Sequence, residues 1–315
     1  MIKHFLKISD LSDEEITGIL DLSLQLKKEL KKKGANKPIF KNKTLAMIFE
    51  KPSLRTRVSF EVGMTQLGGH ALYLGPNDIQ MGKRETIADI SGTLCRYVDI
   101  IMARVFEHKA LQELTKLATV PVINGLSDLE HPCQIMADLL TMLEYKKRLK
   151  GLKVAFVGDG ENNVTHSLAV AAGILGMDFR VANPKGYAMK REIVNEAISL
   201  SKKSGGQIKE FSNLTDAVKE ADVVYTDTWI SMGDEAEKEK RLKVFKGFQI
   251  TNKLMNMAKS DSVFMHDMPA YRGNEVATEV IDGPQSIIFD QAENRLHAQK
   301  GVMAFLIKNS QKIKK

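Results

Sequence analysis

The sequence predicts an α/β protein made of two doubly wound parallel-sheet domains with an interdomain cleft. Short apolar runs alternate with segments of helical periodicity in both halves of the chain. Polar clusters follow several of the expected strands, which is where doubly wound sheets bind ligands. The 315 residues are enough for two hydrophobic cores, and a second alternating series starts after Gly151.

The first domain should begin with a helix and continue through four strands. Ser12-Asp-Glu-Glu15 has the form of a capping box, so a helix is expected to start there. Its apolar residues recur at helical spacing and should form one buried face: Ile16, Ile19, Leu20 and Leu24. Strands are expected at 44–49, 70–74, 98–103 and 119–123.

A helix over 129–149 should follow the first domain, since its apolar pattern runs until Gly151. We then expect strands at 153–157, 179–182, 223–226 and 263–266, helices at 164–175 and 193–203, and a last helix over 292–307. The predicted domains are 1–135 and 150–290, with a C-terminal helix at about 291–315 packing back onto the first. Their strand ends would face each other and form the cleft.

The composition is ordinary for a globular protein, with 43% hydrophobic and 27% charged residues. No apolar run approaches a membrane span, and the N-terminal apolar core is too short for a secretory signal, which favours a cytoplasmic location without membrane binding. The net charge of +7 comes largely from lysine runs without interleaved aromatic residues, so solvated faces explain it better than nucleic-acid binding. Cys95 and Cys133 suggest neither a disulfide framework nor a zinc site, and Cys95 should be a small core residue.

Residues 51–57, Lys-Pro-Ser-Leu-Arg-Thr-Arg, lie where the strand at 44–49 should turn into a helix. Backbone N–H groups at a helix start attract anions, and two arginine forks with two hydroxyl groups would strengthen that attraction. The segment therefore predicts a site for a phosphate dianion. An ordinary basic first turn is the alternative.

His131-Pro-Cys-Gln134 places an imidazole and a carboxamide three residues apart. His131 could donate a hydrogen bond to a developing oxyanion, although a lone histidine is more often structural. Gln134 could pair with an amide group of a ligand.

Three polar clusters follow strands of the second domain. Gly158-Asp-Gly-Glu-Asn-Asn163 lacks the third glycine of a dinucleotide loop, so Asn162 and Asn163 suit hydrogen bonds to another ligand better. Asp227, at the start of Asp-Thr-Trp-Ile-Ser-Met-Gly233, could clamp a substrate ammonium or could cap a helix. His266-Asp-Met-Pro269 carries polar groups next to a proline that restricts the backbone.

Together, Ser53-Leu-Arg-Thr-Arg57, His131-Pro-Cys-Gln134, the segment 227–233 and His266-Asp-Met-Pro269 resemble the ornithine carbamoyltransferase family. The resemblance covers nearly the whole chain, including Leu67-Gly-Gly-His70 and the closing segment 290–300. Within the wider aspartate/ornithine carbamoyltransferase superfamily, the Ser-Met-Gly loop favours ornithine over aspartate as the second substrate.

The resemblance implies transfer of the carbamoyl group from carbamoyl phosphate to the δ-amine of L-ornithine, giving citrulline and phosphate. It implies these carbamoyl-phosphate ligands: Ser53, Leu54, Arg55, Thr56, Gln80, Arg104, His131, Pro132, Cys133, Gln134, Asp267, Met268 and Arg295. Gln80 would come from a neighbouring subunit. The implied ornithine ligands are Asn163, Asp227, Ser231 and Met232, and the implied catalytic residues are Arg55, Arg104, His131 and Asp267.

The resemblance also implies no metal and no organic cofactor, and a homotrimer or an assembly of trimers. It places the enzyme in arginine metabolism without deciding between arginine biosynthesis and degradation. The chain departs from the family pattern at Leu54, where threonine is usual, and at Asp267, where cysteine is usual. Asp267 could attract the δ-ammonium of ornithine or could act as the base. Two alternatives stay open: a carbamoyltransferase for another amine such as putrescine, and a catalytically impaired carbamoyl-phosphate-binding paralogue.

Overall fold

The computed structural model describes residues 3–230 and 235–313 and confirms the predicted α/β class with two parallel sheets. The chain divides into two compact units: the first comprises Met1–Leu140 and Glu293–Lys315, and the second comprises Thr141–Ala292. The divisions fall inside helices α6 (Pro132–Lys146) and α13 (Ile288–Ile313). Within the described ranges, no helix combines the length and the apolar character needed to cross a membrane.

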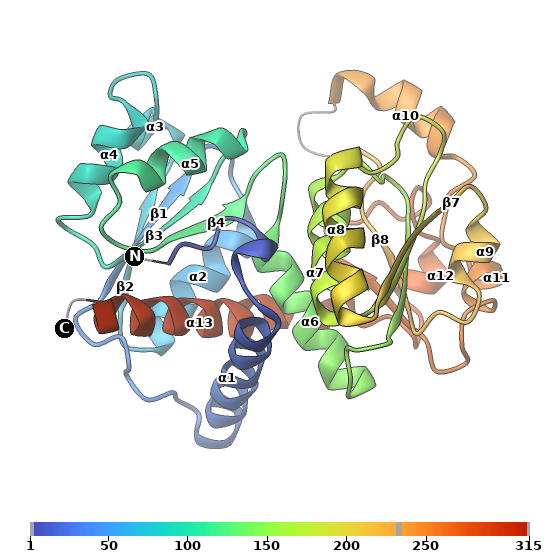
Figure 1. Ribbon diagram of the computed structural model, residues 1–315, viewed down its shortest axis with the longest axis horizontal. Helices are drawn as coiled ribbons and strands as arrows, with labels where there is room; N and C mark the ends of the chain where they lie inside the picture. Colours follow the sequence, from blue (N-terminus) through green and yellow to red (C-terminus); the bar gives the residue numbers. More distant parts are fainter. Residues whose placement is uncertain (1–2, 231–234, 314–315) are drawn as a thin grey trace. The chain divides into compact units, whose positions relative to one another are not determined.

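The first unit is built on a four-stranded parallel sheet with the order β2-β1-β3-β4. Its strands are β1 (Thr44–Phe49), β2 (His70–Leu74), β3 (Ile100–Arg104) and β4 (Val122–Leu126). Its other elements are η1 (Ile8–Asp10), α1 (Asp13–Lys33), α2 (Leu54–Gln66), α3 (Pro76–Ile79), α4 (Ile87–Leu94) and α5 (His108–Lys116). Helices α4 and α5 cover one face of this sheet, and α2 and α13 cover the other (Figure 1).

The second unit contains a five-stranded parallel sheet with the order β7-β6-β5-β8-β9. Its strands are β5 (Lys153–Val157), β6 (Asp178–Ala182), β7 (Gln207–Phe211), β8 (Val223–Thr226) and β9 (Val263–His266). Its other elements are α7 (Asn163–Leu175), α8 (Arg191–Ser204), α9 (Leu214–Val218), η2 (Glu235–Glu237), α10 (Lys238–Phe245), α11 (Asn252–Met255) and α12 (Thr278–Ile281). Helices α7 and α8 lie on one face, and α9, α11 and α12 lie on the other (Figure 1).

The predicted capping box at the start of α1 is confirmed. The Ser12 hydroxyl accepts a hydrogen bond from the Glu15 N–H at 3.2 Å, and the Glu15 carboxylate accepts one from the Ser12 N–H at 3.0 Å. The helix ends at Gly34, whose φ of 72° favours a residue without a side chain. Of the predicted buried face, Ile16, Ile19 and Leu20 are buried as expected, while Leu24 is only half-buried.

Several predicted boundaries are wrong for local reasons. Strand β3 starts later than expected because the Val98 N–H bonds back to Leu94 in the turn that ends α4. Helix α6 starts at Pro132, which suits a first helical position, and Lys147 follows its end with a φ of 61°. Cys95 is the C-cap of α4; it is partly buried and packs against the core of the first unit, so the prediction of a small core residue is confirmed in part. Strand β7 was not expected, because most of its polar side chains face solvent at the edge of the sheet.

The strand order reverses once in each sheet, between β1 and β3 in the first unit and between β5 and β8 in the second. Such reversals open crevices at the carboxyl ends of the strands, where ligands bind. Phe49 at the end of β1 is in register with Arg104 at the end of β3. The topology therefore brings the polar segments after β1, β3, β5 and β8 to the reversals.

Candidate functional site

In the first unit, the predicted anion site is the start of α2. Ser53 is the N-cap, and its hydroxyl oxygen accepts a hydrogen bond from the Thr56 N–H at 3.4 Å. The two hydroxyl oxygens are 3.1 Å apart. Leu54 occupies the first helical position with its side chain 75% exposed, so its backbone, rather than its side chain, contributes to the turn. A helix start with two hydroxyl groups is suited to a phosphate group.

The structure does not place both arginines of this segment at the anion site, as the sequence predicted. The Arg57 guanidinium lies 3.3 Å from the Glu61 carboxylate and 4.1 Å from the centre of the Tyr73 ring. The Lys51 ammonium lies 4.1 Å from the centre of the Phe106 ring. Arg55 is half-buried and is close enough to His131 to influence its ionisation. Arg55 is therefore the arginine of the turn that can serve the site.

Arg295 of α13 joins the start of α2 to α6 through a buried chain of hydrogen bonds. Its guanidinium donates to the Thr56 hydroxyl oxygen at 3.3 Å and to the Gln134 carboxamide oxygen at 2.6 Å. The Gln134 amide nitrogen donates in turn to the Asp138 carboxylate at 2.8 Å. All four side chains are almost fully buried, so their orientations are defined by these partners. The sequence analysis missed Asp138, whose signal is its spacing of one helical turn from Gln134.

His131 is a buried, neutral imidazole under the influence of three arginine charges. Burial lowers the pKa of His131 well below its usual value, and the charges of Arg295, Arg104 and Arg55 lower it further. Arg104, at the end of β3, is itself only 5% exposed. A neutral imidazole surrounded by guanidinium groups can donate a hydrogen bond to an oxygen that gains negative charge. The structure thus brings together three predicted arginines and the predicted histidine.

The segment before His131 is held by buried polar contacts. The Glu130 carboxylate accepts from the Ile8 N–H at 2.9 Å, and the Asn124 side chain donates to the Glu130 carbonyl at 3.3 Å. After His131, Pro132 starts α6, and the Cys133 thiol donates to the Asn124 carbonyl at 3.3 Å. Burial raises the pKa of Cys133 to about 12, which keeps it a thiol. Any role of Pro132 and Cys133 in binding would therefore involve their backbone.

Gln80 is the C-cap of α3, with a φ of 48° and an exposed side chain. In the described part of the chain, its side chain makes no hydrogen bond to the other predicted ligands. Ser231 and Met232, which were predicted to bind ornithine, lie outside the described residues.

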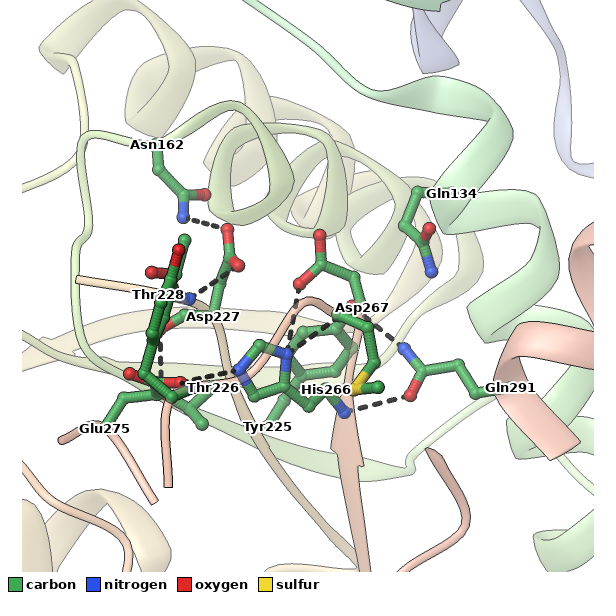
Figure 2. Close-up of polar contacts among 12 residues, drawn as sticks. Gln134, Asn162, Tyr225, Thr226, Asp227, Thr228, His266, Asp267, Glu275 and Gln291 are labelled. Atoms are coloured by element: carbon green, nitrogen blue, oxygen red, sulfur yellow. Dashed lines mark hydrogen bonds and ion pairs between the residues drawn. The ribbon is translucent and has the colours of Figure 1, made fainter. Parts of the chain in front are cut away.

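Asp227 forms the centre of the candidate site in the second unit (Figure 2). Its carboxylate accepts from the Thr228 N–H at 2.6 Å and from the Asn162 side-chain amide at 2.8 Å. Burial raises the pKa of Asp227 well above its usual value, and the neighbouring Asp267 carboxyl raises it further. Asn162 is the N-cap of α7, and the predicted ligand Asn163 follows as its first residue. Asn162, and not the predicted Asn163, therefore contacts Asp227. The two residues follow β5 and β8, the strands on either side of the reversal in strand order.

His266 and Asp267 extend this site (Figure 2). The Nδ1 atom of His266 lies 2.9 Å from the Met268 backbone nitrogen, and Nε2 faces the Glu275 carboxylate at 3.3 Å. Burial lowers the pKa of His266, but the hydrogen bonds and charges of Asp267 and Glu275 outweigh it and raise this pKa above its usual value. Asp267 lies 3.5 Å from Nδ1, and one polar atom from each of Asp227, His266 and Asp267 lies within 4.8 Å of the others.

Two buried residues that support this group were missed from the sequence. Glu275 is fully buried and also accepts a hydrogen bond from the Tyr271 N–H. Gln291 accepts from the His266 N–H at 2.9 Å and donates to the Tyr225 hydroxyl at 3.0 Å. The peptide bond between Met268 and Pro269 is cis. Gln291 could not be found from its spacing, because its partners His266 and Tyr225 are 25 and 66 residues away in the chain. Glu275 lies only nine residues after His266, but no motif in the sequence marks it.

Family models match both halves of the chain. Residues 3–144 match the family described as aspartate/ornithine carbamoyltransferase, carbamoyl-P binding domain, and residues 150–306 match the Asp/Orn binding domain of the same family. An ornithine carbamoyltransferase of Caldicellulosiruptor saccharolyticus is 53% identical over 97% of this chain and 98% of its own length. One from Pyrococcus furiosus, named as anabolic, is 52% identical over 97% of this chain and 96% of its own length.

Solved structures of ornithine carbamoyltransferases are also similar to this chain. The ornithine carbamoyltransferase structure from Pyrococcus furiosus superposes with a TM-score of 0.93 and 51% identity, covering 97% of each chain. The anabolic enzyme from Campylobacter jejuni superposes with a TM-score of 0.92 and 42% identity, covering 98% of this chain and all of the other. With both domains matched and these identities sustained over nearly the full length, the resemblance seen in the sequence is confirmed, and the chain belongs to the aspartate/ornithine carbamoyltransferase family.

Proposed function

We propose that this protein transfers the carbamoyl group of carbamoyl phosphate to the δ-amine of L-ornithine, with citrulline and phosphate as products. The observation that carries the proposal is the neutral, buried His131 among Arg55, Arg104 and Arg295. This group of one histidine and three arginines suits a small anionic acyl phosphate whose carbonyl oxygen gains negative charge during the reaction. The relatives named as ornithine carbamoyltransferases support ornithine as the acceptor.

Carbamoyl phosphate would bind in the first unit. Its phosphate would lie at the start of α2, against the backbone N–H groups from Leu54 onward, the Ser53 and Thr56 hydroxyls and the Arg55 guanidinium. Its carbonyl oxygen would accept hydrogen bonds from Arg104, His131 and Thr56, and its nitrogen would face Gln134 and the backbone of 132–133. Arg295 holds Gln134 and Thr56 in their places. Asp267 and Met268 of the second unit, and Gln80 of a neighbouring subunit, would complete the predicted ligand set.

Ornithine would bind in the second unit. The buried Asp227 carboxyl suits the α-ammonium, and Asn163, Ser231 and Met232 are the other predicted ligands. The neutral δ-amine attacks the carbonyl carbon, the new C–N bond forms, and the C–O bond to phosphate breaks. The proton that the attacking nitrogen then gives up passes to the leaving phosphate, so the products are citrulline and hydrogen phosphate. Negative charge grows on the carbonyl oxygen and on the leaving phosphate, where the arginines and His131 stabilise it. The loss of one such donor typically raises the barrier by about 2.7–4 kcal/mol.

The δ-ammonium must release a proton before the attack, and we infer that Asp267 takes part as the acceptor. Its carboxyl lies close to the Asp227 carboxyl and 3.5 Å from His266, whose far nitrogen faces Glu275. This arrangement supports a role for Asp267 as the base that accepts the proton, rather than a role limited to attracting the δ-ammonium.

The assembly and setting of the enzyme are also proposals. Leu54, Val58 and Val62 form an exposed apolar stripe on α2, and Leu72 of the edge strand β2 is exposed too. Such a surface supports a homotrimer or an assembly of trimers. The Pyrococcus furiosus relative named as anabolic supports a role in arginine biosynthesis. The ordinary balance of hydrophobic and charged residues supports a cytoplasmic enzyme.

The direct test is citrulline formation from ornithine and carbamoyl phosphate with purified protein between pH 6 and 10. Turnover with ornithine exceeding that with putrescine and lysine is expected, and the rate should rise with pH as the amine loses its proton. Preference for putrescine would favour the alternative amine. Binding of carbamoyl phosphate in a calorimeter without turnover of any amine would favour the catalytically impaired paralogue.

A further inference from the structure

A buried ion pair lies beside the Asp227 site in the second unit. Arg241 of α10 and Asp159, in the loop between β5 and α7, are joined at 2.8 Å and are 82 residues apart in the chain. Arg241 is 7% exposed and Asp159 is 2% exposed. Removing two charges from water costs about as much as their attraction returns, so a buried pair gives little net stability. Its presence therefore calls for a reason other than the stability of the fold.

Asp159 shapes the loop in which it lies. Its carboxylate accepts from the Glu161 N–H at 2.9 Å as well as from Arg241, and its carbonyl accepts from the Thr165 hydroxyl at 2.8 Å. The neighbouring Gly160 donates its N–H to the Tyr187 carbonyl at 2.9 Å. A Cβ at residue 160 would come within 2.6 Å of that carbonyl oxygen, so this loop has no room to shift toward residue 187. The path of the loop is thus set from both sides.

The loop ends in Asn162, which is the residue that contacts Asp227. The side-chain carboxamide oxygen of Asn162, the N-cap of α7, accepts a hydrogen bond from the Thr165 N–H at 2.9 Å. This bond leaves the amide nitrogen directed at the Asp227 carboxylate, at 2.8 Å. The position of Asn162 therefore follows from the path of the loop, and the loop is anchored through Asp159.

Arg241 is held in turn by aromatic rings. Its guanidinium carbon lies 5.0 Å from the ring centre of Tyr187 and 5.8 Å from that of Phe245. The Phe245 ring centre is 4.8 Å from that of Tyr187 and 5.8 Å from that of Trp229. Trp229 follows Asp227 by two residues in the chain. The same aromatic cluster therefore supports Arg241 and the segment that carries Asp227.

We propose that Arg241 and Asp159 are positioning residues for the amine substrate, because their ion pair holds Asn162 against Asp227 and so sets the affinity for ornithine. This inference rests on the proposed function. Neither residue is a predicted carbamoyl-phosphate ligand, and most of those ligands lie in the first unit, so the affinity for that substrate should be insensitive to Arg241 and Asp159.

The test compares Arg241→Met with the double variant Arg241→Met/Asp159→Asn. The single variant leaves the Asp159 charge buried without Arg241, so its Tm should fall; the double variant neutralises that charge, so its Tm should recover. In both variants, the KM for ornithine should rise by about 10- to 100-fold, with a smaller change in kcat and the KM for carbamoyl phosphate within about twofold of wild type. Arg241→Lys should keep part of the affinity. A double variant that regains both Tm and KM would show a purely structural pair and would overturn the proposal.

Arg180 provides the matched control. It pairs with Asp178 in the same unit at 2.8 Å, with side chains 16% and 18% exposed, and Arg180→Met should leave the KM for ornithine unchanged. A rise in KM equal to that of Arg241→Met would contradict a specific role. A crystal structure of the double variant tests the geometry without turnover, because the Asn162–Asp227 hydrogen bond should be lost. A retained bond overturns the inference, whereas a lost bond in a protein without citrulline formation would refute only the proposed function.

Discussion

Arg295 donates a guanidinium hydrogen to the Gln134 carboxamide oxygen at 2.6 Å, although the two residues are 161 positions apart in the chain. The bond determines which end of the carboxamide faces Arg295 and which end reaches Asp138. A carboxamide held at both ends has one orientation, and a substrate amide group can be recognised only by groups with fixed orientations.

Arg295→Met should therefore lower kcat/KM for carbamoyl phosphate by about 10²- to 10³-fold, since it removes one donor and releases Gln134 and Thr56. Steady-state kinetics with carbamoyl phosphate as the varied substrate measure the effect. Arg57→Met is the matched control, because Arg57 contacts Glu61 and Tyr73 and should change kcat/KM less than about twofold. Similar losses in both variants would contradict the role of Arg295.

Arg55→Ala should weaken phosphate recognition more than Lys51→Ala. Arg55 lies in the first turn of α2 and influences His131, whereas the Lys51 ammonium lies over the Phe106 ring. The expected loss in affinity for inorganic phosphate is about tenfold or more for Arg55→Ala and less than about threefold for Lys51→Ala. Calorimetric titration with phosphate decides; equal losses would remove Arg55 from the site.

Acidification should destabilise the fold through His131. Because the pKa of His131 is well below its usual value in the folded state, the unfolded chain binds a proton first as the pH falls through about 6.5. Its contribution to the free energy of unfolding is present above that pH and falls by about 1.4 kcal/mol per pH unit below it. His131→Gln should flatten this part of the curve in denaturant unfolding between pH 7 and 5. An unchanged slope would mean that His131 is charged in the folded protein.

Asp267→Asn should stabilise the unliganded protein at pH 7 while reducing its activity. The Asp267 carboxyl raises the pKa of Asp227 in the folded state, after the larger effect of burial, so this pair loses stability as the pH rises through the folded-state pKa. Removing one charge should raise Tm by about 2–4 °C at pH 7, with little change at pH 4. Calorimetry and citrulline formation measure the two effects.

Asp267→Cys restores the residue usual in the family and separates the possible roles of Asp267. Lower activity than wild type would show that Asp267 is part of the catalytic site. A gain of activity in a wild type that otherwise only binds carbamoyl phosphate would support the impaired paralogue instead.

The position of site residues at the ends of strands could be predicted, because each polar cluster directly follows a short apolar run in the sequence. The start of α2 needed only the pattern around Ser53, and Asp227 needed only its position after β8. The orientation of Arg57 toward Glu61 could not be read from sequence order, since it depends on the helix face and on Tyr73 of the neighbouring strand. The contact between Asn162 and Asp227 could not be predicted either, because the order of the strands in the sheet brings these two residues together.

Helix α13, the last helix of the chain, belongs to the first unit, so this unit can be completed only late in protein synthesis. The first unit needs residues from α13, such as Lys300, whose ammonium donates to Asn36 and Gln66, and Arg295, which reaches Thr56. The ribosome completes residue 140 long before residue 293, and at usual elongation rates the interval is about 8 to 30 seconds. During synthesis, the N-terminal half therefore waits without this helix, and the hydrogen bonds from Arg295 to Thr56 and Gln134 can form only when translation is nearly finished.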